Sequence, residues 1–369
     1  MKFDSLPTIE AFAEIEMLED VVSSCVLGNS RFAVGTIDGK LQIFETDNLL
    51  QEAEFDSAII SIIDSGEKVV AASAIGQIKS INESPSWQHE IQSGIEHMIS
   101  LGDVICISDT SGSIIFLNSK GDKERTQSHG DVNRLAHSVD GNYFAIAKTD
   151  GTLLLSSKSG EILQESFADP EDVETISQIC FRSDGILLAC RDSLGMTLDE
   201  RPENRLECWH PQRGLLHTTE LPAMATSILA TEDGAIVGCQ NGAILRFRIG
   251  KDVEELLIVD NSVSSIIQWD KDLIIGTWFN AMRISSSGEL IWSYEHEGLV
   301  SEVLAISSDL ITVIGQSPAG QNPASVVLLE PNSEPIIPED ESFVYEFSNI
   351  TPNEFAGGLS DEEIAKAEA

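Results

Sequence analysis

Five arginines lie close together in the middle of the chain, and their side chains could bind carboxylates. Positions 182 to 213 hold Arg182, Arg191, Arg201, Arg205 and Arg213, together with the acids Asp199, Glu200 and Glu203. A guanidinium group can grip a carboxylate through two parallel N–H donors, and arginine is enriched at interface hot spots. Either these charges pair within one loop, or they contact a partner. We predict a partner-binding site that includes Arg191, Asp199, Glu200, Arg201 and Arg205.

Two aromatic residues form the other candidate contact. Trp278 and Phe279 stand in "GTWFNAMRIS", at the expected tip of a hairpin where polar residues are usual. They either cap the core, which we favour slightly, or present an apolar contact to a partner. Both residues join the predicted partner-binding set.

No pattern of catalytic or metal-binding residues emerges from the sequence. The chain has no GxSxG, P-loop or GxGxxG pattern, and its seven histidines are not arranged as metal ligands. Its six cysteines form no CxxC pair and mostly lie in apolar runs, which is typical of buried, reduced thiols. We therefore expect no enzymatic activity, no cofactor and no metal.

The charge balance narrows the choice of partner. The 369 residues carry 61 acids and 22 bases, which gives a formal net charge of −39. Phosphate binding needs clustered Lys and Arg, and anionic lipid surfaces repel an acidic protein, so neither nucleic acid nor membrane is an expected partner. No apolar run is long enough to cross a bilayer and no secretory signal is evident, so we expect a cytoplasmic protein whose partner is another protein.

The elements that would position these residues come from a repeat of about forty residues. A tight turn with glycine recurs in "TIDGKLQIF", "SAIGQIKSI", "DTSGSIIFL", "KTDGTLLLS" and "CQNGAILRF", with Gly at 39, 76, 112, 151 and 242. In "TWFNAMRIS", Asn280 takes the place of Gly, and Asn also tolerates positive φ. Two further copies have a longer central loop: one between Cys190 and Arg205, and one in "VIGQSPAGQNPASVVLL". The chain therefore contains eight copies.

Each copy predicts four short strands, and this pattern indicates an all-β propeller with eight four-stranded antiparallel blades. A lone four-stranded sheet exposes both faces, whereas radial stacking buries them. Seven blades plus an irregular hairpin is the fallback. We predict one domain over 1–338, with blades at about 20–55, 56–91, 92–128, 129–167, 168–221, 222–259, 260–297 and 298–338.

The chain ends complete this prediction. The alternating segment 11–17 should supply the outer strand of the last blade and close the ring, because an open blade edge is a liability. The segment "SEPIIPE" is the competing choice, but its prolines argue against a strand. Residues 339–369 form an acidic tail with a possible short helix at 361–368, where Ser360 and Glu363 could make a capping box.

The segment from His129 to Leu155 resembles a WD-repeat, although Ser156 and Ser157 stand where that family has Trp-Asp. Trp209 in "RLECWHPQRGLL" occupies the corresponding Trp position. "SSSGELIWSYEHE" and "ESPSWQHEIQ" instead resemble the quinoprotein-type (PQQ-like) repeat. The resemblance implies a β-propeller fold, a histidine at 129 that bonds within its blade, and a loop face that carries the ligand site.

Two classes of function remain open on these grounds. The first is a non-enzymatic scaffold or complex subunit that presents its loop face to a protein. The alternative is a quinoprotein-like or other propeller enzyme, or a small-ligand binder, that uses the central channel. The missing export signal and the lack of a recognisable calcium cluster argue against a quinone-dependent dehydrogenase.

Overall fold

The computed structural model describes residues 6–66, 68–81, 86–169, 173–193, 202–317 and 324–337. The predicted acidic tail at 339–369, with its possible helix at 361–368, lies outside the described residues. So does the larger part of both predicted long loops, at 194–201 and 318–323.

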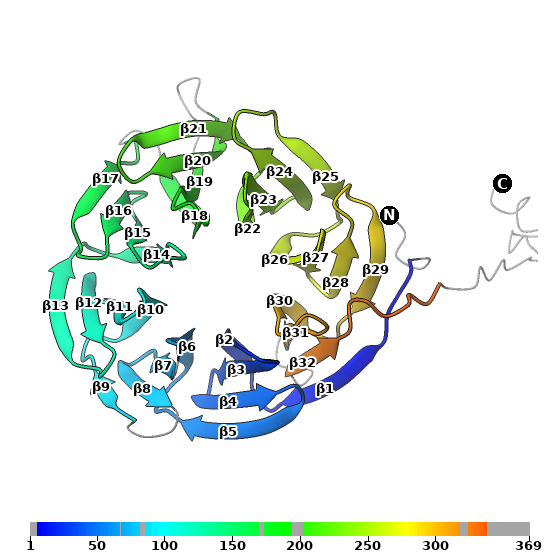
Figure 1. Cartoon of the computed structure of the whole chain (residues 1–369), viewed down its shortest axis with the longest axis horizontal. Coiled ribbons are helices and arrows are strands. Elements are labelled where there is room, and N and C mark those ends of the chain that lie inside the picture. Colours follow the sequence, from blue (N-terminus) through cyan, green and yellow to red (C-terminus); the bar gives the residue numbers. More distant parts are fainter. Residues whose placement is uncertain are drawn as a thin grey trace, which may run out of the picture.

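Eight four-stranded antiparallel sheets form a ring, as predicted (Figure 1). Each blade is given from its inner to its outer strand. Blade 1 consists of β2 (Val21–Gly28), β3 (Arg31–Thr36), β4 (Lys40–Glu45) and β5 (Asn48–Glu54), and blade 2 of β6 (Ile59–Asp64), β7 (Val69–Ser73), β8 (Gln77–Ile81) and β9 (Gln88–Glu90). Blade 3 consists of β10 (Ile95–Ser100), β11 (Val104–Asp109), β12 (Ser113–Asn118) and β13 (Lys123–Ser128), and blade 4 of β14 (Val132–His137), β15 (Tyr143–Lys148), β16 (Leu153–Ser157) and β17 (Ile162–Ser166).

Blade 5 consists of β18 (Glu174–Phe181), β19 (Leu187–Ser193), β20 (Asn204–His210) and β21 (Gly214–Glu220). Blade 6 consists of β22 (Ala225–Ala230), β23 (Gly234–Cys239), β24 (Ala243–Arg248) and β25 (Glu254–Ile258), and blade 7 of β26 (Val263–Trp269), β27 (Asp272–Thr277), β28 (Asn280–Ile284) and β29 (Leu290–Glu295). The eighth blade contains β30 (Leu299–Ala305), β31 (Ile311–Gln316) and β32 (Ala324–Leu329), with β1 (Ala11–Met17) outermost.

The N-terminal strand closes the ring, which confirms the prediction for residues 11–17. β1 pairs antiparallel with β32 from Ala11 opposite Leu329 onward. The prolines around Ile336 leave only an isolated bridge to Thr8, so this segment does not replace β1 as a strand. Joining the two ends of the chain in one sheet removes the open edge that β32 would otherwise expose.

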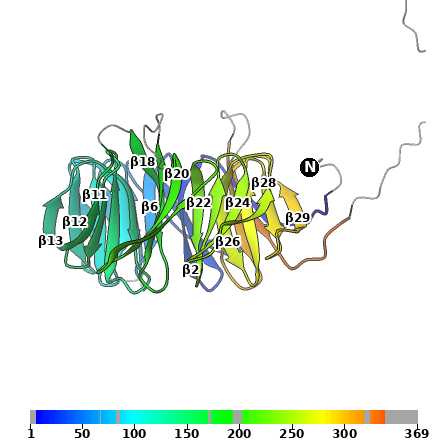
Figure 2. The same ribbon diagram turned by 90° about the horizontal axis from the view of Figure 1, so that it is seen from above.

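The strands run between the two faces of a disc (Figure 2). One face carries the turns between the second and third strands of each blade and the connections from blade to blade; we call it the connection face. The opposite face carries the other turns. The predicted turn glycines at 39, 76, 112, 151 and 242 all have positive φ. At Gly76 a Cβ atom would lie 1.7 Å from the carbonyl oxygen of Ile91, so no other residue fits. Asn280 does not take the predicted turn position with positive φ. It is the first residue of β28, and it is not among the described residues that have positive φ.

The hydrophobic core lies between blades rather than inside any one of them. One cluster joins Leu188 and Leu206 of blade 5 to Val237 and Leu245 of blade 6. Because both faces of most second and third strands are covered by neighbouring blades, these strands are apolar almost throughout. The same stacking fixes the position of each inner strand around the central channel.

All eight inner strands carry a β-bulge at the same place, one residue after their first buried apolar residue. The bulges follow Val21, Ile59, Ile95, Val132, Ile176, Ala225, Val263 and Val300. A bulge re-aims the side chains next to it. Here polar side chains beside the bulges bond to the next blade: Gln178 Nε2, for example, donates to Thr226 O at 2.9 Å. These bonds hold neighbouring inner strands together without direct strand pairing.

Candidate functional site

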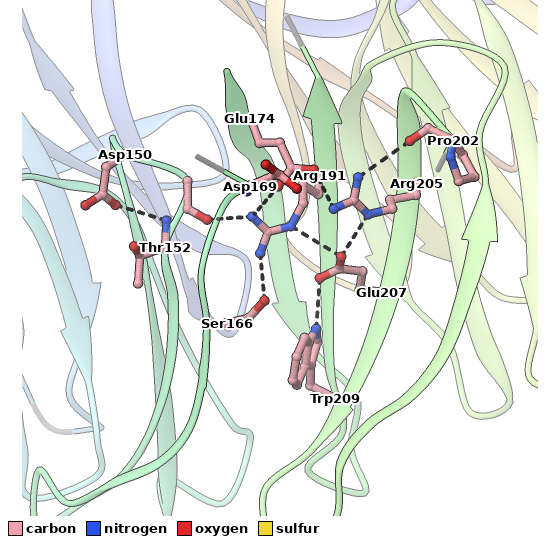
Figure 3. Close-up of polar contacts among 11 residues, drawn as sticks. Asp150, Thr152, Ser166, Asp169, Glu174, Arg191, Pro202, Arg205, Glu207 and Trp209 are labelled. Carbon is pink, nitrogen blue, oxygen red and sulfur yellow. Dashed lines mark hydrogen bonds and ion pairs between the residues drawn. The ribbon is translucent and has the colours of Figure 1, made fainter. Parts of the chain in front are cut away.

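The arginines of blade 5 lie in a buried ion-pair network (Figure 3). Arg191, on β19, is only 1 % exposed. Its Nε donates to Glu207 Oε1 at 3.2 Å, and its Nη1 donates to Glu174 Oε2 at 3.4 Å and to Gly151 O of blade 4 at 2.6 Å. Every contact is to the protein itself, so in this arrangement the Arg191 side chain does not reach a partner.

Arg205, on β20, completes the same network. Its Nη2 donates to Glu174 Oε1 at 2.6 Å and its Nε to Glu207 Oε1 at 3.0 Å, while the indole N–H of Trp209 donates to Glu207 Oε2 at 3.1 Å. Two guanidinium groups therefore balance two carboxylates from neighbouring strands. Arg191 and Arg205 thus pair within the protein, but with acids on strands β18 and β20 and not within one loop, as the alternative from the sequence had it. Asp199, Glu200 and Arg201 lie outside the described residues, and their role in partner binding stays a prediction.

A fifth charged group, Asp192, lies beside this network. It is 1 % exposed, and burial raises the pKa of its carboxyl to about 6 against the opposing effects of the Ser177 hydroxyl, the Ala225 backbone and Arg205. The carboxyl group is therefore held in an environment that disfavours its charge.

Trp278 and Phe279 form the turn between β27 and β28 on the connection face. The Trp278 side chain is 54 % exposed, and the two rings meet edge to face with centroids 6.3 Å apart. The Trp278 carbonyl accepts a hydrogen bond from Val300 N, and Phe279 O accepts one from His296 N at 2.6 Å. The turn is thus held against the connection that leads into β30. The exposed Trp278 side chain does not cap the core, and the contact of Trp278 and Phe279 with a partner stays a prediction.

His296 anchors that connection. Its Nδ1 accepts from Gly298 N at 2.8 Å, and its Nε2 lies 2.9 Å from Ser325 Oγ on β32. The ring lies against Gly315, where a Cβ atom would come within 2.0 Å of His296 Cε1. By contrast, His129 Nε2 has no hydrogen-bond partner among the described residues, so the bond that the WD-repeat resemblance implied for His129 is not observed.

Other exposed apolar side chains lie on the connection face, at blades 8 and 1. Leu299 begins β30, Val22 is the second residue of β2, the inner strand of blade 1, and Leu18 and Ile37 lie in the neighbouring loops. The Ile37 amide bonds to Asp20 O, which ties these two loops together. These residues and Trp278 belong to blades 7, 8 and 1, and we call them the apolar rim.

A cavity of about 260 Å³ shares Val22 with the apolar rim and lies where the inner strands of blades 7, 8 and 1 begin. Its lining comes from the inner strands of the same three blades and from β31, and it includes Val22, Ser23, Ser264, Ser301, Glu302 and Gln316. Glu302 accepts a hydrogen bond from the Ser24 hydroxyl, which crosses the junction between blades 8 and 1. Burial is the main cause of the raised pKa of the Glu302 carboxyl. We call this space the mouth cavity.

Sequence reasoning missed the mouth cavity. The signal was a serine next to the predicted start of several inner strands, as in "VVSSC", "SVSSII" and "LVSEVL". Scattered serines carry no specific meaning alone. Only the ring brings Ser23, Ser264 and Glu302 together from positions nearly 280 residues apart.

A larger cavity, of about 520 Å³, lies at the opposite face. Its lining includes Cys25, Asp64, His137 and Asp140 from the inner strands and turns of blades 1, 2 and 4. Burial raises the pKa of the Cys25 thiol to about 11, so this thiol is not poised as a thiolate nucleophile. Within the described residues no group of three or more His, Cys, Asp or Glu side chains is placed to hold a metal ion. The described part of the chain also has no helix of the length and apolar character needed to span a membrane.

The same architecture occurs in solved structures that share little sequence with this chain. Saccharomyces cerevisiae Sqt1 is 11 % identical with a TM-score of 0.72, and the match covers 90 % of this chain and 100 % of Sqt1. The C-terminal WD40 domain of Sif2 is 14 % identical with a TM-score of 0.69, covering 88 % and 99 %. Chaetomium thermophilum Sqt1, bound to the N-terminus of the ribosomal protein L10, is 13 % identical with a TM-score of 0.69, covering 87 % and 99 %.

These likenesses establish the fold alone: the chain is an eight-bladed β-propeller of the kind found among WD-repeat proteins. No protein-family model matches the sequence, and no curated protein matches it.

Proposed function

We propose that this protein is a non-enzymatic scaffold that binds a segment of another protein on the connection face, over blades 7, 8 and 1. The observation that carries the proposal is the apolar rim, which meets the mouth cavity at Val22. Its largest side chain, Trp278, is 54 % exposed on a turn held by backbone hydrogen bonds to Val300 and His296. A large, preorganised aromatic side chain is the kind of residue that contributes most to protein binding.

The comparisons support a role in protein recognition without identifying the partner. One similar propeller was crystallised with the N-terminus of the ribosomal protein L10. For this chain, the net charge of −39 favours a partner of opposite charge through long-range attraction. The six cysteines are free thiols, which suits a reducing compartment, and we propose that the protein acts in the cytoplasm.

Site-specific photo-crosslinking in extract of the native host tests the proposed face. A photoreactive phenylalanine analogue at position 278 or 299 should cross-link a defined protein. The same group at Val139, which is exposed on the opposite face, should not. Trp278→Ala should lower binding of that protein at least tenfold, whereas Val139→Ala should leave it unchanged. Cross-links that form only from position 139, or equal binding by the Trp278→Ala variant, would refute the proposed face.

The predicted blade-5 contact is a separate part of the proposal. Asp199, Glu200 and Arg201 stand in the sequence between the end of β19 at Ser193 and the start of β20 at Asn204. A photoreactive group at position 200 tests it in the same experiment. Cross-linking to the same protein as position 278 would extend the interface to blade 5. Its absence would limit the interface to blades 7, 8 and 1.

Binding of a small ligand is the second candidate function, because the cavity at the opposite face is large enough, at about 520 Å³, for such a molecule. This possibility can be tested by incubating the purified protein with a metabolite library and measuring the midpoint of thermal unfolding. Asp140 lines the cavity. A ligand that raises the midpoint of the wild type but not that of Asp140→Asn would favour small-ligand binding.

A further inference from the structure

The mouth cavity presents mainly hydrogen-bond acceptors, and this is a consequence of how the blades are joined. Ser264 Oγ donates to Val300 O at 2.8 Å, Ser301 Oγ donates to Ile314 O at 3.2 Å, and Ser23 Oγ donates to Ile59 O. A serine hydroxyl has one hydrogen to donate and two lone pairs. Because each of these hydrogens is used inside the protein, the three hydroxyls can only accept bonds from an entering group.

Glu302 adds a carboxylate to these acceptors. One of its oxygens accepts from Ser24, and no cationic side chain pairs with it among the described residues. Two other lining groups are not purely acceptors: Ser265 accepts from Val303 N and keeps its own hydrogen, and Gln316 Nε2 donates to Val21 O. The balance still favours a donor-rich, positively charged occupant over an anion or a neutral acceptor.

The size and surroundings of the mouth cavity further restrict the occupant. Its volume of about 260 Å³ is several times the roughly 30 Å³ share of one water molecule, so it can admit a side chain. Val22 in its lining and Leu299, two residues before the lining residue Ser301, are apolar and partly exposed. Lysine and arginine combine an aliphatic stem with a charged end, and this combination matches an apolar rim around a polar floor. The exposed indole of Trp278 can in addition stack on a guanidinium group.

We propose that the mouth cavity binds a lysine or arginine side chain of the partner, with Glu302 and the hydroxyls of Ser23, Ser264 and Ser301 accepting its N–H groups. This inference rests on the proposed function and names the chemistry of its partner: a protein segment in which a basic residue is flanked by apolar ones. The net charge of −39 attracts such a segment over a long range, whereas Glu302 selects the residue that enters.

Selection from a library of random peptides displayed on phage tests the inference on the full chain. Peptides whose binding requires Trp278 should share a lysine or arginine at one position beside an apolar residue. For a selected peptide, replacing the basic residue with norleucine should weaken binding to the wild type by about tenfold, the effect expected for one desolvated ion pair. The same replacement should have little effect on binding to Glu302→Gln.

Glu297→Gln is the matched control, because Glu297 is an exposed acid in the connection just before β30 and does not line the cavity. This variant loses the same charge and should keep the preference for a basic residue. Glu302→Gln preserves the side-chain shape and can still accept from Ser24. An unchanged unfolding midpoint shows that the variant is folded.

The outcomes separate the inference from the proposed function. Peptides that need Trp278 but share no basic position would refute the inference and leave the docking face intact. Selected peptides that are indifferent to Trp278→Ala would refute both. Loss of the basic preference in Glu297→Gln as strongly as in Glu302→Gln would also refute the inference, because the preference would then come from the overall charge. Displacement of the peptide by an equal concentration of spermidine would assign the cavity to free polyamines instead.

Discussion

Arg191 is the buried charge on which blade 5 depends most directly. It contacts Glu174 and Glu207 as well as the backbone of blade 4. We expect Arg191→Met to lower the free energy of unfolding by about 3 kcal/mol, because removing one member of a buried ion network leaves its partners undercompensated. Urea denaturation measures this change.

Arg213→Met is the control for this prediction. Arg213 is exposed in the turn between β20 and β21 of the same blade, so its replacement should change the free energy of unfolding by less than about 0.5 kcal/mol. Equal effects of the two substitutions would show that the network contributes no more to stability than a surface arginine.

Asp192 should give the fold a measurable pH dependence. Its folded-state pKa of about 6 lies above the ordinary value of 3.8, so its carboxyl favours the folded state most at low pH. That contribution is lost as the pH rises from about 4 through 6. We therefore expect the stability of Asp192→Asn, relative to the wild type, to rise by roughly 2 kcal/mol over this interval. Denaturant titrations at several pH values measure the difference, and a stability difference between the two proteins that does not change with pH would contradict the prediction.

At the residue scale, the sequence indicated where charge and aromatic groups gather but not how they are paired. The density of arginines is visible in the sequence. Glu174, however, reaches Arg191 and Arg205 from another strand, and only the sheet register shows that contact. The exposure of Trp278 differs from the sequence interpretation, which slightly favoured core capping for this hairpin tip. Glu302 escaped notice because its significance depends on serines from two other blades.

At the scale of elements, the connection before β30 links the turn of Trp278 to the last blade. Its position depends on the contact between His296 and Gly315, where added bulk has no space. We expect Gly315→Ala to destabilise the protein by about 1–3 kcal/mol, as overpacking does in other cores. We also expect weaker binding at Trp278, because the displaced ring no longer holds the adjoining turn.

A double-mutant cycle separates the proposed contact from other effects at Gly315. Truncation in His296→Ala creates room, so adding Gly315→Ala to that variant should be less damaging than adding it to the wild type. Thermal unfolding of the four proteins gives the coupling energy. Additive losses would mean that the His296 ring is not what excludes a Cβ atom at position 315.

Strand positions were easier to predict than the details of the inner strands. The turn glycines stand at regular intervals and require positive φ, so they mark the middle of each blade. The bulges have no comparable sequence signature, because the residue type after the bulge differs from blade to blade: it is Ser23 in blade 1, His97 in blade 3 and Arg134 in blade 4. The bulges direct polar groups across the blade junctions, and so the hydrogen bonds that line the channel could not be foreseen.

At the scale of the whole molecule, the eight-blade count was predictable because each blade leaves a separate signature in the sequence. Closure was predictable for a physical reason: β32 must have a neighbour, and β1 was the segment with a suitable alternation. The mouth cavity is a property of the closed ring, since its lining comes from blades 7, 8 and 1 and includes the junction where the chain ends meet. Ring closure and the binding site are therefore expected to be coupled.

Deletion of residues 1–19 tests this coupling. It removes β1 and the buried Met17 side chain, and it leaves the edge of β32 unpaired. Burial of one such side chain contributes about 1.5–3 kcal/mol, so we expect the unfolding midpoint to fall by more than about 5 °C and the protein to associate through the open edge. A synthetic peptide spanning residues 6–20 should restore the midpoint and the monomeric state, whereas the same peptide with Ile15→Pro, which removes a backbone donor, should not.

Because Ser24 and Glu302 meet across this junction, the shortened chain should also lose its preference for peptides with a basic residue until the β1 peptide is added. A truncated protein that keeps the wild-type midpoint and the same preference would show that the ring is held by its blade interfaces alone and that the site does not depend on closure.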